Sequence, residues 1–205
     1  MKHDDAKVRQ IRAAAKTLFL RHGFAKVSTA ALAKEAGVSK ETLYTRYPSK
    51  EAILADVLEH LITTTEEPQR TAPVMASRTD LEHALRVFAD RLLAGLMDRE
   101  YVELTRIVIA ETPRLPHVGE TFRHAVPERA LAGARELLAA ARDAELIEDM
   151  DLDSAALLLV SPLVIHVVFH VLLVAPSAGE PPKAMDVAAH VALFLRTITF
   201  KEDAS

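Results

Sequence analysis

The sequence predicts an all-α fold in which a short N-terminal group of helices precedes a longer helical bundle. Apolar residues recur at spacings of three and four along most of the chain, as they do on one face of a helix. Prolines and glycines divide these segments into helical lengths, and no stretch alternates between apolar and polar residues as a half-buried strand does. Ala and Leu supply much of the apolar content, which favours helices.

The beginning of the chain predicts a helix followed by a capped second helix. Apolar residues from Val8 to Phe19 fall on one helical face, and Gly23 ends that helix because glycine tolerates the positive φ of a helix C-terminus. Ser28 or Thr29 is suited to cap the second helix, since a hydroxyl at this position accepts a hydrogen bond from a free backbone amide.

Two more helices follow closely. Gly37 interrupts the second helix, and Ser39 can cap a third over residues 40–47. Pro48 stops the third helix, and Ser49 can cap a fourth with an apolar stripe over residues 52–61. A helix, a glycine turn and a second short helix are the parts of a helix-turn-helix, which the first helix must hold together.

The remainder of the chain predicts a helical bundle. Residues 63–77 form a polar connector that contains two prolines. Beyond it, the apolar periodicity and the prolines predict helices at about 78–98, 100–112, 116–125, 127–146, 152–175 and 183–201.

One segment of this bundle is long and apolar enough to raise a second interpretation. No Lys, Arg, Asp or Glu occurs from Ser154 to Gly179, and a helix of this length could span a bilayer. Pro162, two histidines and the absence of flanking basic or aromatic residues argue against a membrane segment. The favoured interpretation is a helix that packs on its own core with one face and on a partner subunit with the other.

The formal net charge of −4 is unevenly distributed. Residues 1–50 hold 11 Lys and Arg against 4 Asp and Glu, a balance of +7, whereas residues 51–205 hold 14 against 25, a balance of −11. A basic block on one small unit favours a polyanionic partner such as DNA, although a solvated charged surface has the same composition. The absence of cysteine excludes disulfides and thiol nucleophiles, and no signal-peptide run is found, so we expect a cytoplasmic protein.

The segment 40–47 has the side chains that a DNA-reading helix needs. In a helix-turn-helix, the second of the two short helices lies in the major groove of double-stranded DNA, where its outward residues meet base edges and phosphates. The residues with suitable cationic, hydroxyl, methyl or phenol groups are Lys40, Thr42, Tyr44, Thr45, Arg46 and Tyr47.

Residues 24–54, FAKVSTAALAKEAGVSKETLYTRYPSKEAIL, resemble the signature of the tetracycline-repressor (TetR) family of transcriptional regulators. The shared elements are an Ala-Gly-Val turn, a Ser-x-x-Thr-Leu-Tyr recognition helix and a Pro-Ser-Lys-Glu-Ala start to the fourth helix. The resemblance covers about the first quarter of the chain. It implies a helix-turn-helix DNA-binding domain at 1–50 and a helical-bundle ligand-binding and dimerisation domain at 51–205.

The resemblance also implies roles for matching positions. The phosphate contacts would be Ser28, Thr29, Tyr44 and Lys50. The residues at or near bases would be Lys40, Glu41, Thr42, Thr45 and Arg46. The alternative interpretation of Glu41 is a charge that suits the start of its helix. Two positions depart from the family. Ala30 replaces an arginine with which the family's namesake reads a base. Tyr47 replaces the usual Phe, and we expect its ring to pack inward, which argues against a phosphate contact.

Other constellations give no support for catalysis. His166 and His170 are four residues apart, as metal-ligand pairs are, but no carboxylate in their helix completes a site. Asp149, Asp151 and Asp153 mimic the opening of a calcium loop that lacks its glycine and its final glutamate. With no glycine-rich phosphate loop and no nucleophile motif, we expect neither an enzyme nor a protein that holds a metal or cofactor.

We therefore expect an allosteric repressor that binds a palindromic operator as a homodimer. A small hydrophobic effector would enter the C-terminal domain, shift the fourth helix and change the separation of the two recognition helices. The dimer interface would come from the helices at 152–175 and 183–201, through Val168, Val187, Val191, Phe194 and Leu195. The alternative is an activator or architectural DNA-binding protein that needs no ligand.

The effector site is expected among the helices that lie between residues 78 and 175. Ligand sites commonly join an apolar wall to a few polar groups that orient the ligand. The candidate wall residues are Phe88, Leu92, Leu96, Ile107, Ile109 and Phe122. The candidate polar residues are Arg106, Glu111, His124, Ser161, His166 and His170. The alternative is that the wall and polar residues simply fill a core.

Overall fold

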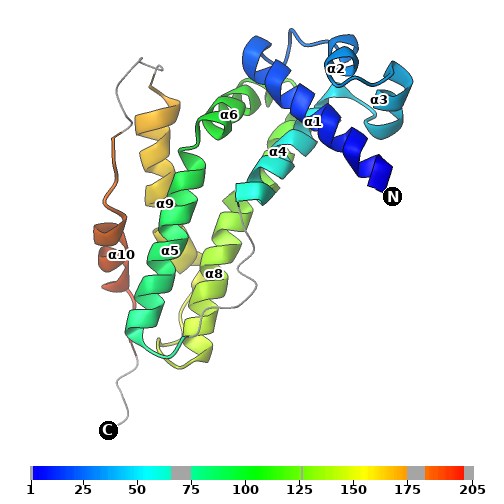
Figure 1. Ribbon diagram of the computed structural model, residues 1–205. Helices are drawn as coiled ribbons and strands as arrows, with labels where there is room; N and C mark the ends of the chain where they lie inside the picture. Colours follow the sequence, from blue (N-terminus) through cyan, green and yellow to red (C-terminus); the bar gives the residue numbers. More distant parts are fainter. Residues whose placement is uncertain (1, 66–74, 126, 175–182, 201–205) are drawn as a thin grey trace. The chain divides into compact units, whose positions relative to one another are not determined.

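The computed structural model describes residues 2–65, 75–125, 127–174 and 183–200. Within these ranges the chain forms ten α-helices and a five-residue π-helix, and the only β feature is an isolated bridge between Ile147 and Phe200 (Figure 1). This confirms the all-α fold class. The helices form two compact units, one from residues 1–67 and 99–126 and the other from residues 68–98 and 127–205.

The first unit contains the predicted helix-turn-helix. Its helices are α1 (Lys2–His22), α2 (Thr29–Glu35), α3 (Lys40–Arg46), α4 (Lys50–Thr65), α6 (Arg99–Glu111) and α7 (Pro116–Ala125). Helix α1 packs against α2, α4 and α6, while α4 also packs against α7. Because α4, α6 and α7 share this unit, compact packing extends past residue 50. The functional boundary expected at that residue remains a prediction.

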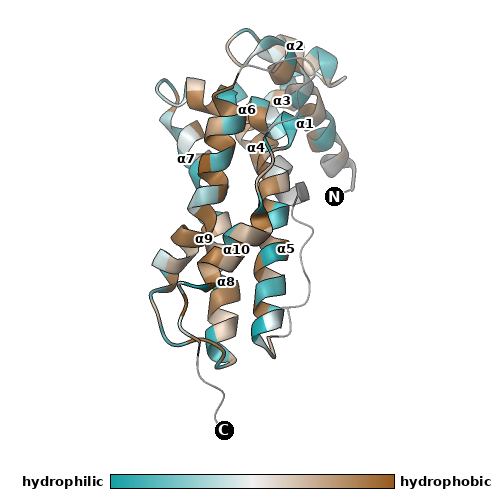
Figure 2. Cartoon of the chain, turned by 90° about the vertical axis from the view of Figure 1, so that its left-hand side faces the viewer, coloured by the Kyte–Doolittle hydropathy of each residue, from teal (hydrophilic) through white to brown (hydrophobic). Residues whose placement is uncertain are grey.

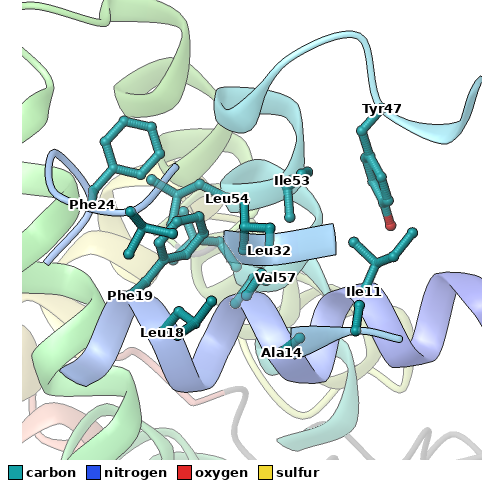
Figure 3. Close-up of a cluster of buried hydrophobic side chains, with 14 of the residues drawn as sticks. Ile11, Ala14, Leu18, Phe19, Phe24, Leu32, Tyr47, Ile53, Leu54 and Val57 are labelled. Carbon is teal, nitrogen blue, oxygen red and sulfur yellow. The ribbon is translucent and has the colours of Figure 1, made fainter. Parts of the chain in front are cut away.

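A single apolar cluster holds the first unit together. Figure 3 shows Ile11, Phe19, Leu32 and Leu54 converging from α1, α2 and α4, and all four are fully buried. Leu43 of α3 belongs to the same cluster. Burying a leucine or isoleucine side chain contributes about 1.5–3 kcal/mol. Helix α2 is held against α1 and helix α3 against α2, with Leu43 joining α3 to the cluster.

The second unit is a bundle of four α-helices and the π-helix. Its elements are α5 (Arg78–Leu96), α8 (Pro127–Asp143), α9 (Leu152–Val167), η1 (Val168–Leu172) and α10 (Val187–Leu195). Helix α9 packs against α5, α8 and α10, and α5 also packs against α8 and α10. Asp151 caps α9, because its side chain accepts hydrogen bonds from the amides of Asp153 and Ser154 at the start of that helix.

Two helices of the second unit differ from their predicted lengths. The segment expected at 152–175 continues beyond α9 as a π-helical turn. The helix expected at 183–201 is shorter, because Asp186 caps it at the amide of Ala189 and the helix ends at Leu195. After α8, the chain reverses at Glu145, which adopts a positive φ of 59°. Apolar periodicity locates such helices better than it locates their ends.

The segment Leu152–Leu172 is long and apolar enough to cross a membrane by length and composition alone. This is weak support for a membrane segment, because the core helix of a soluble protein passes the same test. Residues such as Leu159 and Leu163 on this segment are fully buried within the chain.

Candidate nucleic-acid interface

The helix-turn-helix of α2 and α3 is defined by a serine cap at the start of each helix and by one glycine in the turn between them. The Ser28 side chain accepts a hydrogen bond from the amide of Ala31 at 3.1 Å, and the Ser39 side chain accepts one from the amide of Thr42 at 3.0 Å. Gly37 adopts a φ of +64°, which side-chain-bearing residues rarely do. These features confirm the helix-turn-helix geometry and set the direction of α3.

Helix α3 presents its polar residues outward. Leu43 is fully buried, which fixes the inner face of the helix. Among the expected DNA-reading residues of this helix, Lys40, Glu41, Tyr44 and Thr45 are exposed and Thr42 and Arg46 are half-buried. The predicted residues of α3 are therefore at least partly accessible, although Nε of Arg46 is buried, whereas Tyr47 is not accessible.

Hydrogen bonds between hydroxyl groups order this face. The hydroxyls of Thr29 on α2 and Tyr44 on α3 lie 2.9 Å apart, so the two predicted phosphate-binding groups form one pair. The Thr45 hydroxyl donates to the carbonyl of Glu41 at 2.8 Å. Because side chains already fixed in place lose less entropy on binding, this arrangement suits recognition of a rigid partner.

Tyr47 packs inward, as expected for its ring, and its phenol does not reach the DNA-contacting surface. The residue is only 8% exposed, and its hydroxyl donates a hydrogen bond of 2.6 Å to Oδ2 of Asp56 on α4. Arg12 on α1 donates two hydrogen bonds of 2.8 Å to the same carboxylate. Its assignment to the DNA-contacting set is corrected, because the phenol lies inside the unit and its hydroxyl is bonded to a carboxylate.

Burial on one side, and hydrogen bonds with the charge of Arg12 on the other, change the pKa of Asp56 in opposite directions. Burial alone would raise the pKa of Asp56, but the hydrogen bonds from Arg12 and Tyr47 and the charge of Arg12 lower the pKa below its usual value. Burial and the neighbouring Asp56 carboxylate raise the pKa of Tyr47. The carboxylate therefore stays ionised and the phenol stays protonated at neutral pH.

Lys50, the first residue of α4, points toward the chain between α1 and α2. Its Nζ donates hydrogen bonds to the carbonyls of Phe24 at 2.8 Å and Val27 at 3.0 Å, and lies 4.2 Å from the centre of the Phe24 ring. Sequence reasoning placed this ammonium on a phosphate. The contacts that hold it are with backbone residues more than 20 positions earlier, which local patterns do not reveal.

Comparison with known proteins agrees with this geometry. The family model described as bacterial regulatory proteins of the tetR family matches residues 11–57. The C-terminal domain of AefR-like transcriptional repressors matches residues 83–197, more than half of the chain. The chain belongs to the TetR family. It is therefore a helix-turn-helix, DNA-binding transcriptional regulator, and proteins of this family are generally not enzymes.

Solved structures of TetR-family proteins resemble the whole chain. A TetR-family regulator from Mesorhizobium loti is 27% identical, with a TM-score of 0.68, over 96% of this chain and 98% of its own. The flavonoid-responsive regulator FrrA is 30% identical, with a TM-score of 0.70, over 94% and 97%. A regulator from Agrobacterium tumefaciens, at 23% identity over 96% and 95%, shares the fold with a TM-score of 0.70. No protein with a curated description matches the sequence.

The candidate effector residues of this TetR-family protein fall in both compact units. In the second unit, Leu96 is buried and Leu92 is half-buried on α5. The half-buried ring of Phe88 lies against α8, since a Cβ added to Gly133 would be 3.0 Å from it. Ser161 on α9 is exposed. Phe88 and Leu96 therefore contribute to packing between helices, which agrees with the alternative interpretation of these candidates as core residues.

In the first unit, the candidate effector residues differ in accessibility. Arg106, Ile107, Glu111 and Phe122 are half-buried, whereas Ile109 and His124 are exposed. The ring of Phe122 on α7 stacks on Tyr101 of α6, with the ring centres 6.3 Å apart.

Two polar residues at this contact were missed by sequence reasoning. Tyr101 and Thr105 are buried one helical turn apart on α6, and burial raises the pKa of Tyr101 to about 12. Polar residues four positions apart on an apolar helical face were the available signal.

The predicted pair of histidines, His166 on α9 and His170 on η1, lies close together in the structure, and His166 has a backbone partner that the sequence did not indicate. The rings of His166 and His170 lie 4.7 Å apart, and Nε2 of His166 is 2.8 Å from the carbonyl oxygen of Lys183. Desolvation and the nearby His166 and Lys183 lower the pKa of His170. Backbone hydrogen bonding thus supplies the polar partner that a histidine in an apolar helix needs.

Most of the residues predicted at the dimer interface are buried inside the chain, and other apolar residues are exposed instead. Val187, Val191, Phe194 and Leu195 are buried inside the chain, which corrects their assignment to a subunit interface, and Val168 is half-buried. Figure 2 shows α9 and α10 as predominantly hydrophobic helices. The large apolar residues that these elements and the residues just after η1 leave exposed are Leu157, Leu158, Ile165, Phe169, Leu173, Val174 and Leu193. We call this set the exposed apolar face.

Proposed function

We propose that the protein is a cytoplasmic repressor that binds a palindromic operator as a homodimer and leaves it when a small, largely hydrophobic ligand binds. The observation that carries this proposal is the accessible polar face of α3, held by the buried Leu43 and by the Ser39 cap. A rigid helix with outward cationic and hydroxyl groups fits the major groove.

The residues of the proposed interface divide into two chemical classes. Ser28, Thr29 and Tyr44 would contact phosphates, because their hydroxyls are donors that suit the DNA backbone. Lys40 and Arg46 would read base edges, since cationic donors pair well with guanine. Thr42, Thr45 and Glu41 would lie at or near the bases between them.

The homodimer rests on the exposed apolar face. Phe169 is 59% exposed and Leu158 is equally so, on a segment that carries no Lys, Arg, Asp or Glu from Ser154 to the end of η1. Contiguous exposed apolar residues in a monomer mark an interaction surface. A two-fold dimer would present two copies of α3 to successive major grooves, about 34–36 Å apart.

The ligand class rests on similarity and on the composition of the second unit. FrrA, 30% identical over nearly the whole chain, is flavonoid-responsive. The apolar side chains of α5 and α9 and the few polar groups among them suit an aromatic or acyl compound with a polar end. Ligand binding would release DNA only through its different affinity for the DNA-bound and the free conformations.

A mobility-shift experiment tests the proposal. The protein is titrated onto a duplex from the region upstream of its own coding sequence, and a flavonoid, a long-chain fatty acid or a hydrophilic charged compound is then added. Release by one of the two hydrophobic classes alone supports the proposal. Binding that no compound relieves would favour the ligand-independent activator or architectural protein, and release only by the charged compound would contradict the ligand class.

A further inference from the structure

The ammonium group of Lys50 is bound to the backbone that joins α1 to α2. That segment begins at Gly23, whose amide donates to the carbonyl of Phe19 at 2.9 Å and whose φ is +77°. It continues through the buried residues Phe24 and Val27, between which a hydrogen bond of 3.3 Å closes a tight turn. We call residues 23–27 the α1–α2 turn. Both carbonyls that accept from Lys50 belong to it.

A lysine at this place has an electrostatic cost that its contacts offset. Lys50 is the first residue of α4, and the helix dipole disfavours a cation at a helix N-terminus. Two charge-assisted hydrogen bonds and the face of the Phe24 ring favour the cation instead. Since the side chain is half-buried on these partners, its contacts indicate a role in fixing the α1–α2 turn.

We propose that Lys50 is a positioning residue for DNA binding, which holds the α1–α2 turn so that Ser28 and Thr29 reach the phosphates. Ser28 directly follows Val27, so the carbonyl that Lys50 binds fixes the place where α2 starts. Thr29 then pairs with Tyr44 and carries the constraint to α3. This inference rests on the proposed DNA binding, and differs from it in assigning Lys50 to the backbone of its own chain instead of to a phosphate.

The experiment compares Lys50→Met with Lys26→Met, which removes an exposed lysine from the same turn. Amide hydrogen exchange of the two full-length variants is measured without DNA. Lys50→Met should speed exchange at the amides of Val27 and Ala31 about tenfold, while Lys26→Met leaves both rates unchanged. Unchanged exchange in Lys50→Met would overturn the proposal, and this measurement holds whether or not the protein binds the DNA tested.

A salt titration distinguishes positioning from direct phosphate contact. The probe is a duplex that the unmodified protein enriches from random-sequence DNA. Lys50→Met should weaken binding about tenfold with the salt dependence of the unmodified protein, because no phosphate contact of Lys50 is lost. A decrease in the logarithmic salt slope of about 0.9 for each Lys50 would overturn the proposal. Failure of the unmodified protein to enrich any sequence would instead count against the proposed function.

Discussion

The hydroxyl of Tyr47 donates a hydrogen bond of 2.6 Å to the carboxylate of Asp56, which also accepts two hydrogen bonds from Arg12. Tyr47 ends α3, Asp56 lies on α4 and Arg12 lies on α1, so one carboxylate joins three helices. The contact fixes the end of the recognition helix from inside the unit. It makes Tyr47 a structural residue in a segment whose other polar residues face outward.

Replacing Tyr47 with Phe should lower the free energy of unfolding by about 1.5 kcal/mol, because a hydrogen bond to a charged acceptor is lost and the ring stays in place. Tyr44→Phe is the matched control. Its phenol is exposed on the same helix, so its loss should cost less than about 0.5 kcal/mol. Urea denaturation of both variants measures the difference, and equal losses would show that the Asp56 contact contributes nothing.

The stabilising effect of Asp56 should depend on pH in a defined direction. Its pKa is lowered in the folded protein, so the ionised carboxylate stabilises the fold above the unfolded-state pKa of about 3.9. That stability is lost as the pH falls through the lower folded-state pKa. The difference in unfolding free energy between the unmodified protein and Asp56→Ala should stay constant between about pH 5 and 7 and shrink below about pH 4. A difference that grew on acidification would refute this assignment.

Residues of α3 should separate into base-reading and backbone-binding groups. Lys40→Ala and Arg46→Ala should each relax the preference at particular base pairs, by about 1–3 kcal/mol. Tyr44→Phe should weaken binding to all sequences alike, because a phosphate contact carries no sequence information. Binding titrations against single-base variants of one operator measure this. The assignment is inverted if Tyr44→Phe changes the preference while Lys40→Ala does not.

The dimer should depend on the exposed apolar face and not on the residues beneath it. Phe169→Asp should yield a folded monomer, since it places a charge where a partner subunit would bury an apolar ring. Ile109→Asp on α6, where the side chain is also 59% exposed, should leave the dimer intact. Light scattering and circular dichroism report mass and folding. A Phe169→Asp protein that remained dimeric would place the interface elsewhere.

The helix-turn-helix was predictable because its determinants are local. Glycine at position 37, the serine caps at 28 and 39 and the proline at 48 each act within a few residues of the chain. The inward packing of the Tyr47 ring was also expected, but its partner Asp56 and the backbone partners of Lys50 were not, since they lie 9 and 23–26 residues away. Tyrosine and lysine in a basic segment are typical of DNA contacts. In the folded chain, however, both side chains form hydrogen bonds within the protein.

The prediction of the dimer-interface residues was wrong for a different reason. The sequence of α9 is apolar on nearly every side, so periodicity cannot distinguish the face that meets the chain's own core from the face left exposed. Helix α10 has the same property, and its residues Val187, Val191, Phe194 and Leu195 proved to be core. Among the candidate effector residues, the sequence likewise cannot distinguish an apolar residue of the core from one that binds a ligand. Contacts such as that of Phe88 with α8 are needed to identify a core residue.

Selection of random-sequence duplex DNA by the purified protein tests the central claim most directly. The enriched sequences should share an inverted repeat whose half-sites are centred about 10 base pairs, or a multiple of this, apart, because two copies of α3 must enter successive major grooves. Lys40→Ala should enrich the same repeat with a relaxed preference within each half-site. Enrichment of no sequence above the starting pool, or of a single unrepeated site, would contradict a dimeric sequence-specific regulator.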